Sequence, residues 1–345
     1  MKTNEAYMQR CIDISKNGLR NAMPNPSVGA VIVHNGKIIG EGYTSPYGGN
    51  HAEVNAINSV NDKSLLPQSA IYVSLEPCSH IGKTPPCAEL IAKHKLKAVV
   101  IGCTDSNSLV SGNGIQKLKD TGCEVITGVL EKECKESNKR FFTFQEKKRP
   151  YVILKWAQSA DGFIDKTRIS SEIPSTKITS QTANTLVHKW RSEEMAIMVG
   201  TNTVLLDNPT LTVRFINGKN PIRVVIDREY KLPKSSNIFN NSSPTICYTS
   251  SNSHKENDIE WVRINFINTL EEILKDLHQR NILSLFVEGG RQVLQSFIDA
   301  NLWDESRVFT SDLEIESGVK APEINKIPIK MLQIGIDKLA LYRND

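Results

Sequence analysis

The sequence predicts an α/β protein of two domains in series, and three observations carry this prediction. The chain has 345 residues, which is enough for two domains with cores of ordinary size. Short apolar runs alternate with segments of helical periodicity in both halves, as in sheets covered by helices. A charged stretch, QEKKRP, separates the halves. We therefore expect one domain over 1–145, a linker at 146–150 and a second domain over 151–345.

The first half begins with a helix and a hairpin. Apolar residues recur at helical spacing within 5–17, and the run GAVIVHNGKIIGEG has two apolar segments around Asn35-Gly36, the strongest short hairpin signal. Pro85-Pro86 precedes another helical segment, because proline favours the first turn of a helix. The later elements are expected as a helix from His51, a strand at 70–74, a helix at 87–94, a strand at 98–102, a helix around 115–119, a strand at 124–126 and a helix at 130–144.

The second half continues the alternation. Short apolar runs predict buried strands, and the amphipathic segments between them predict helices. Neither a repeat nor a low-complexity tract interrupts the chain. Strands are expected at 151–156, 196–200, 223–226 and 284–287, and helices at 181–192, 270–279 and 292–300.

Composition argues against several classes of protein. The net charge of +4 is small for this length, which disfavours a dedicated nucleic-acid binder. No apolar stretch follows the N-terminus and no run is long enough to span a bilayer, so we expect a cytoplasmic protein. Seven cysteines, an odd number, fit reduced thiols better than disulfides. Five of them are interpreted as core or surface thiols: Cys11, Cys103, Cys123, Cys134 and Cys247.

Two cysteines and a histidine predict a zinc site. Cys78 and Cys87 flank a loop with three prolines, and His51 lies upstream in HAEVNAI. A neutral imidazole and two thiolates are good zinc ligands and leave a fourth position open, which marks a catalytic metal. Glu53 can face the same site from the first turn of a helix and transfer protons there. Each part alone is common, but the order His-x-Glu, Pro-Cys, Cys is specific.

The segments HAEVNAI, LEPCSHIGKTPPC and MPNPSVGAVIV together resemble the RibD family of bifunctional riboflavin-biosynthesis proteins, over nearly the whole chain. The resemblance implies a cytidine-deaminase-like three-layer sandwich followed by a dihydrofolate-reductase-like α/β domain. It implies zinc-dependent hydrolytic deamination of 2,5-diamino-6-(5-phosphoribosylamino)pyrimidin-4-one, then NADPH reduction of the ribosyl arm to ribityl. We expect the protein to bind this small molecule and neither nucleic acid nor a membrane. We also expect it to form a homo-oligomer, a dimer or a tetramer.

In the deaminase half, the resemblance implies that Asn25 and the backbone of 28–30 line the pyrimidine pocket, although Asn25-Pro26 also fits a simple turn. The loop between the cysteines would wall this pocket. Within it, His80 is a spare ligand, a substrate contact or a surface residue. Lys83 stands where relatives usually carry arginine and offers phosphate a charge without a bidentate fork.

The stretch CTDSNSLVSGNG resembles an Asp-Pro-Asn-Pro segment of the family. Serines replace both prolines, at Ser106 and Ser108, which leaves the stiffness of this loop open. Asp105 and Asn107 are retained, so the resemblance still implies a substrate contact there.

The second half lacks the Gly-x-Gly-x-x-Gly fingerprint of a Rossmann domain. Instead it has two strand–glycine–helix junctions, at 196–214 and 285–297. Gly289-Gly290 allows the backbone to approach a ligand, and the helix that follows can present free amides to a pyrophosphate. Either junction alone would more often be a packing feature, and their pairing favours nucleotide binding.

Together with LKWAQSADGFI, these junctions resemble the family's reductase half. The resemblance places NADPH at Ala157, Lys177, Thr203, Asp207, Arg228, Gly290, Arg291, Gln292, Val293, Leu294, Gln295 and Ser296. It places the substrate at Ser175, Arg191, Leu211, Arg214 and Glu288.

Several of these positions keep a second interpretation. Arg191 suits a phosphate or is an ordinary helix-surface charge, and Leu211 fits the core equally well. Lys177 replaces the tryptophan that relatives usually carry. Asp207 orients groups or supplies a proton through water, or it caps a turn. Arg228 meets the 2′-phosphate of NADPH or is a solvated charge at a strand end.

Two other functions remain open. A deaminase of free or nucleic-acid bases, fused to an unrelated α/β domain, would leave the NADPH positions unexplained. A catalytically inactive binding protein predicts a broken metal set, whereas His51, Glu53, Cys78 and Cys87 are all present.

Overall fold

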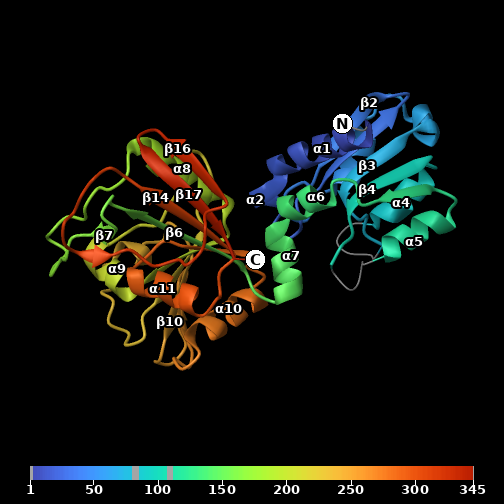
Figure 1. Cartoon of the computed structure of the whole chain (residues 1–345). Helices are drawn as coiled ribbons and strands as arrows, with labels where there is room; N and C mark the ends of the chain where they lie inside the picture. The colour runs from blue at the N-terminus through green and yellow to red at the C-terminus, as the bar shows by residue number, and fades with distance from the viewer. Residues whose placement is uncertain (1–2, 80–84, 107–111, 345) are drawn as a thin grey trace. The chain divides into compact units, whose positions relative to one another are not determined.

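The structure, a computed structural model, describes residues 3–79, 85–106 and 112–344 (Figure 1). The chain divides into two compact units, Met1–Lys148 and Arg149–Asp345. Both units are mixed α/β, as the alternating pattern of the sequence predicts. Among the described residues, no helix combines the length and the apolar character needed to cross a membrane.

Unit 1 contains a five-stranded sheet with the order β2-β1-β3-β4-β5. The predicted hairpin forms β1 and β2, which turn at Asn35-Gly36, and β3, β4 and β5 run parallel. The strands are β1 (Gly29–His34), β2 (Lys37–Tyr43), β3 (Ala70–Leu75), β4 (Ala98–Cys103) and β5 (Glu124–Thr127). The helices are α1 (Thr3–Ser15), η1 (Lys16–Gly18), α2 (Leu19–Ala22), α3 (Ala52–Ser59), η2 (Lys63–Gln68), α4 (Cys87–Lys93), α5 (Asn113–Asp120), α6 (Glu131–Ser137) and α7 (Lys139–Lys147).

Helices cover both faces of this sheet. Helix α3 packs against β1 and β2, with α4 and α5 beside it, whereas α1 and α6 cover the other face. Glycines permit the close approach: a Cβ at Gly40 would lie 2.6 Å from the Ala56 carbonyl oxygen, and a Cβ at Gly29 would collide with the backbone of Cys11. Unit 1 is therefore a helix–sheet–helix sandwich with α3 and α4 on one side.

The helix predicted over 130–144 is broken into α6 and α7 at Asn138. The side-chain oxygen of Asn138 accepts the backbone N–H of Ser27, at 2.9 Å, and the backbone there leaves helical geometry. This partner is 111 residues away in the sequence, which is why periodicity alone misses the break. Helix α7 then continues to Lys147, so helix occupies the first residues of the expected linker.

Unit 2 is built on a ten-stranded sheet with the order β11-β12-β10-β9-β8-β13-β6-β14-β17-β16. The strands from β12 to β14 are parallel, and β11, β17 and β16 are antiparallel to their neighbours. The sheet strands are β6 (Tyr151–Gln158), β8 (Ala196–Gly200), β9 (Ile222–Ile226), β10 (Thr245–Thr249), β11 (His254–Glu256), β12 (Ile259–Arg263), β13 (Ser284–Val287), β14 (Glu305–Thr310), β16 (Lys330–Ile334) and β17 (Asp337–Arg343). A separate pair joins β7 (Phe163–Asp165) to β15 (Val319–Lys320).

The helices of unit 2 lie on opposite faces of this sheet. On one face, Val152 and Leu154 of β6 pack with α10 and α11, and on the other face Ile153 packs with α8. This alternation follows from the two-residue period of a strand. Lys155 and Ala157 share the parity of Ile153 and therefore face the α8 side. The helices are α8 (Gln181–Glu193), α9 (Thr201–Asp207), η3 (Asn237–Phe239), α10 (Thr269–Gln279) and α11 (Arg291–Asp299).

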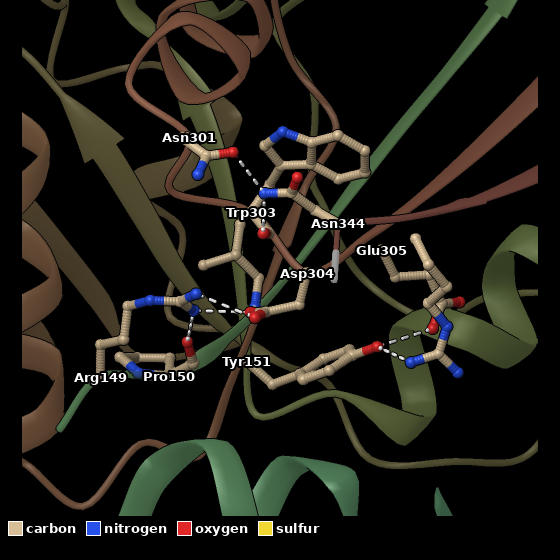
Figure 2. Close-up of polar contacts among 10 residues, drawn as sticks. Arg149, Pro150, Tyr151, Asn301, Trp303, Asp304, Glu305 and Asn344 are labelled. Atoms are coloured by element: carbon tan, nitrogen blue, oxygen red, sulfur yellow. Dashed lines mark hydrogen bonds and ion pairs between the residues drawn. The ribbon is translucent and has the colours of Figure 1, made fainter. Parts of the chain in front are cut away.

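Asp304 connects the first residues of unit 2 to its last residues through hydrogen bonds (Figure 2). Its carboxylate pairs with the guanidinium of Arg149, at 2.5 and 2.8 Å, and accepts the backbone N–H of Val152 at 2.8 Å. Its carbonyl oxygen accepts the backbone N–H of Asn344 at 3.0 Å. Arg149, which we expected in the linker, is thereby tied into unit 2.

Candidate active sites

The metal set of unit 1 comes together at the starts of two helices. His51 is the residue before α3, Cys87 is the first residue of α4, and Cys78 lies between β3 and α4. The Nδ1 atom of His51 lies 3.3 Å from Cys87 Sγ and 3.5 Å from Cys78 Sγ, and the three ligand atoms lie within 4.8 Å of one another. Tetrahedral zinc would place nitrogen and sulfur about 3.6 Å apart, so these residues fit the ion.

The environment of Cys78 favours its thiolate. A hydrogen bond from the Cys87 thiol, followed by the influence of His51, lowers the pKa of Cys78 to about 4, although burial opposes this shift. The backbone N–H of Cys87, at the first turn of α4, also points at Cys78 Sγ from 3.4 Å. A helix start leaves such amides unpaired and carries partial positive charge, which suits an anionic ligand.

Glu53 is the second residue of α3 and is buried, with 4% of its surface exposed. Burial, followed by the charge of Cys78, raises the pKa of Glu53 to about 7. The carboxyl group interacts with the thiol of Cys87, so it lies beside the ligand set. A buried carboxyl group with such a pKa can both accept and donate a proton near neutral pH.

The other residues expected in this pocket are placed only in part. The backbone N–H of Asn25 donates to the Ala22 carbonyl oxygen at 3.0 Å, which fits the turn interpretation. Residues 28–30 are buried at the start of β1. Asp105 is buried and follows β4. Four expected residues lie outside the part of the chain that the structure describes: His80, Lys83, Asn107 and Ser108.

In unit 2, the two strand–glycine–helix junctions lie side by side, because β8 and β13 are parallel neighbours. Gly290 has a φ of +74°, and a Cβ there would lie 3.2 Å from Thr203 Oγ1 on α9. A Cβ at Gly200 would lie 2.8 Å from the side chain of Val293 on α11. The beginnings of α9 and α11 thus meet at the carboxyl ends of adjacent strands, where α/β proteins bind nucleotides.

Most positions that the resemblance assigns to NADPH lie at this edge. Thr203 is in the first turn of α9, residues 291–296 are in α11, and Ala157 is near the carboxyl end of β6. Arg228 follows β9, is exposed, and its guanidinium stands 5.5 Å from the ring centre of Phe266. Leu294 differs from the other assigned positions because its side chain is buried in the hydrophobic core.

Asp207, the last residue of α9, is engaged by Arg168 rather than free. Arg168 pairs with the carboxylates of both Asp207 and Asp165, and Asp165 accepts the backbone N–H of Thr176 at 2.9 Å. This arrangement fastens the segment around Thr176 to α9. The neighbouring side chains of Ser175 and Lys177, two expected contacts, are exposed.

Arg191 of α8 and Glu288, which follows β13, form a bidentate ion pair, at 2.7 and 2.6 Å. Burial alone would raise the pKa of Glu288, but Arg191 and Lys155 lower it to about 2. Arg191 is therefore not an ordinary surface charge, because its guanidinium is paired with Glu288. The substrate contact that the resemblance implies for Arg191 stays a prediction. Leu211 is buried in the core at a φ of +55°, which fits its packing interpretation.

Sequence reasoning missed Lys155, which belongs to the same cluster. Burial lowers the pKa of Lys155, while the charge of Glu288 opposes this shift. His188 and Arg214 complete the group: the backbone N–H of Arg214 donates to His188 Nδ1 at 3.0 Å. Three cationic side chains, Lys155, Arg191 and Arg214, accompany one carboxylate, Glu288, so the cluster suits an anionic ligand. The available signal was a lysine inside the apolar run YVILKWA.

These two sites define the class of the protein: a zinc-dependent deaminase domain joined to a nucleotide-dependent reductase domain. The sequence comparisons agree. Residues 1–103 match the "Cytidine and deoxycytidylate deaminase zinc-binding region", and residues 150–312 match the "RibD C-terminal domain".

Full-length relatives specify the family. The riboflavin biosynthesis protein RibD of Aquifex aeolicus is 38% identical over 325 residues, covering 92% of this chain and 89% of the relative. RibD of Bacillus amyloliquefaciens is 39% identical over 332 residues, covering 93% and 87%. The crystal structure of a diaminohydroxyphosphoribosylaminopyrimidine deaminase/5-amino-6-(5-phosphoribosylamino)uracil reductase from Thermotoga maritima is 37% identical, with a TM-score of 0.88 over 99% of this chain and 98% of that one.

The chain belongs to the RibD family. It is a bifunctional deaminase and reductase of riboflavin biosynthesis, with zinc and NADPH as its cofactors. The expected fold class, a deaminase-like domain followed by a dihydrofolate-reductase-like domain, is confirmed.

Proposed function

We propose that unit 1 deaminates 2,5-diamino-6-(5-phosphoribosylamino)pyrimidin-4-one to 5-amino-6-(5-phosphoribosylamino)uracil, and that unit 2 reduces the ribosyl arm of this product to ribityl. The observation that carries the proposal is the convergence of His51, Cys78 and Cys87 beside the buried carboxyl group of Glu53. The substrates named for the Thermotoga maritima relative are consistent with it.

In the first step, His51, Cys78 and Cys87 hold the ion. Zinc, when bound, supplies a Lewis acid that makes hydroxide available from water near neutral pH. Glu53 takes up the proton that this water loses and delivers it to the ring nitrogen as the hydroxide adds to the ring carbon. It then takes the proton of the added hydroxyl group and delivers it to the amino group, which leaves as ammonia while the carbonyl forms. Its pKa of about 7 suits both roles, because neither direction of transfer is strongly uphill.

In the second step, NADPH supplies the hydride and the protein orients it against the sugar carbonyl. The starts of α9 and α11 hold the cofactor phosphates, with Thr203 and residues 290–296 in contact. Arg228 contacts the 2′-phosphate. Asp207 serves mainly to anchor Arg168, since its carboxylate is paired there.

The substrate of unit 2 is held by the cationic cluster. Arg214 and Lys155 contact its anionic groups, and Arg191 positions Glu288. The excess of positive charge in this cluster supports a phosphorylated substrate over a neutral one. In unit 1, Asn25, the backbone of 28–30 and Asp105 line the pyrimidine pocket.

We also propose a cytoplasmic homo-oligomer that binds neither nucleic acid nor membrane. None of the seven cysteines forms a disulfide, which suits a reducing compartment. The edge strand β16 and the segments on either side of it expose four large apolar side chains, which supports burial against a second copy. These residues are Ile327, Ile329, Met331 and Ile336.

The test is a two-stage assay with the phosphoribosylamino-pyrimidine. Without NADPH, the enzyme should release ammonia and accumulate the ribosylated uracil, and added NADPH should then convert this product to its ribityl form. Deamination of free cytosine or of single-stranded nucleic acid instead, with no NADPH oxidation, would support a base deaminase fused to an unrelated domain.

A further inference from the structure

Glu76 directly precedes Pro77-Cys78 and has a side chain that is almost completely buried, with 4% of the residue exposed. Its carboxylate lies among backbone amides, and within the part of the chain that the structure describes it forms no ion pair. One oxygen, Oε2, accepts the N–H groups of Asp105 at 3.3 Å and Gly112 at 3.1 Å. The other, Oε1, accepts those of Gly114 at 3.1 Å and Ile115 at 3.3 Å.

These amides belong to two segments that are distant in the sequence. Asp105 follows β4, whereas Gly112, Gly114 and Ile115 form the beginning of α5. The amides of a first helical turn have no acceptor within the helix, and they carry partial positive charge. The carboxylate of Glu76 supplies that acceptor, so one side chain joins the end of β3, the end of β4 and the start of α5.

Gly114 provides a second, independent contact between α5 and the metal-ligand segment. A Cβ at this position would collide with the carbonyl oxygen of Pro77. Only glycine therefore allows the first turn of α5 to lie directly on Pro77. The backbone of Glu76 is fixed as well, because its N–H donates to the Cys103 carbonyl oxygen at 2.9 Å.

The consequence concerns Cys78. Unlike His51 and Cys87, which stand at helix starts, Cys78 lies outside regular secondary structure. The carbonyl oxygen of Cys78 accepts the N–H of Ala88 on α4, at 3.1 Å, which fixes the C-terminal side of this residue. On its N-terminal side, the position of Cys78 depends on Pro77 and Glu76. An error of a few tenths of an ångström there would change the separations of 3.3 and 3.5 Å that suit zinc.

We propose that Glu76 is a positioning residue of the deaminase, which holds Cys78 in ligand geometry by locking the Pro77-Cys78 segment to the start of α5 and the end of β4. It does so without contacting the substrate or the ion. Residues that orient metal ligands typically change metal affinity or activity by about 10- to 100-fold when they are replaced.

The test is Glu76→Gln in the full-length chain, with the zinc dissociation constant measured by competition with a chromogenic chelator. Glutamine keeps the volume but turns one acceptor oxygen into an N–H donor that faces other N–H groups. We expect zinc affinity to fall about tenfold or more, and the kcat of deamination to fall further than KM changes. Reductase activity in the same chain should stay at the wild-type level, which reports that unit 2 is intact, and unchanged hydrogen exchange of peptides from β1 and β3 reports that unit 1 is folded.

Glu124→Gln is the matched control, because Glu124 is exposed at the start of β5 in the same unit. It should leave zinc affinity unchanged. Wild-type zinc affinity and kcat in Glu76→Gln would overturn the proposal. Should that variant fail to fold, Gly114→Ala decides the question: it disturbs the same junction from α5, and it should weaken zinc binding, whereas unchanged binding would overturn the proposal.

This inference rests on the proposed zinc ligands, and Cys78→Ala measured alongside separates the two. If Cys78→Ala keeps wild-type zinc affinity, the ligand assignment itself fails. If Cys78→Ala loses zinc while Glu76→Gln and Gly114→Ala bind it normally, only the role of Glu76 is contradicted.

Discussion

The guanidinium of Arg191 forms a bidentate ion pair with the carboxylate of Glu288, with N–O distances of 2.7 and 2.6 Å, and the side chains are only 12% and 8% exposed. The two residues come from α8 and from the end of β13, so the pair joins a helix to the central strands. Removing one partner of such a pair leaves a buried charge without compensation.

Glu288→Gln should therefore lower the free energy of unfolding of unit 2 by about 3–5 kcal/mol and abolish reduction, with deamination retained. The measurement is urea-dependent hydrogen exchange, followed on peptides from α8 and β13 so that unit 1 does not contribute. Glu260→Gln is the control, since Glu260 pairs with Arg280 where the two side chains are 34% and 28% exposed, and it should lower the free energy of unfolding by about 1 kcal/mol or less. Equal losses in the two variants would contradict the proposed role of the buried pair.

His188 should make unit 2 sensitive to moderate acid. Burial, followed by the charges of Arg191 and Arg214, lowers the pKa of His188 from 6.5 to about 4. Between these values the unfolded chain binds a proton that the folded chain does not, so stability falls as the pH drops from about 6.5 to 4. The free energy of opening of α8 peptides, obtained from hydrogen exchange corrected for the intrinsic exchange rate at each pH, should fall over this range. His188→Asn keeps an acceptor for the Arg214 N–H and should remove this component, and an unaltered pH dependence in the variant would assign it to other groups.

Arg228 should select NADPH over NADH. Its guanidinium is exposed beyond β9, and a charge-assisted contact with the 2′-phosphate is worth roughly 1.5–3 kcal/mol, or about ten- to a hundredfold in affinity. Arg228→Ala should raise the KM for NADPH about tenfold and leave that for NADH nearly unchanged, with Arg228→Lys in between. Steady-state kinetics with both nucleotides at one salt concentration is the test. An equal effect on both cofactors would show that Arg228 supports a part they share.

The two units should be separable between Lys148 and Arg149. Helix α7 ends at Lys147, and Arg149 is paired with Asp304 inside unit 2 (Figure 2). Residues 1–148 should deaminate and residues 149–345 should reduce when each fragment is expressed alone. Gel filtration and activity of each fragment are the measurements, and an insoluble fragment would show that its core depends on the other unit.

The sequence predicted the central strands of the ten-stranded sheet in unit 2 but missed strands on either side of them, such as β14. The four strands predicted there, β9, β8, β13 and β6, are consecutive in the sheet, and buried parallel strands have continuous apolar sequences. Strand β14, ESRVFT, was missed because it carries Glu305 and Arg307. Both are buried, and they neutralise each other at 2.7 Å. A charge pattern on one strand does not reveal such a pairing.

The same limit applies to the sites. The order of His51, Cys78 and Cys87 was sufficient to predict their convergence, because each lies next to a predictable strand or helix. The role of Glu76 was not predictable, because the backbone amides that it accepts lie about 30 to 40 residues away. For Arg168, the neighbouring Asp165 was visible in the sequence, but its second carboxylate partner, Asp207, lies 39 residues away on α9. For Glu53, spacing predicted the location, but its raised pKa follows from burial that only the fold provides.

Glu53→Gln tests the central claim most directly, since the claim is that one chain carries two independent active sites and that this carboxyl group moves the protons of the first. Glutamine keeps the shape of the side chain but does not exchange protons near neutral pH. In one preparation of the variant, zinc content, ammonia release and NADPH oxidation on deaminated substrate should be measured together. We expect one zinc per chain, a deamination rate lowered by about a hundredfold or more, and wild-type reduction. Deamination at the wild-type rate with zinc bound would contradict the assignment of Glu53 and the mechanism built on it.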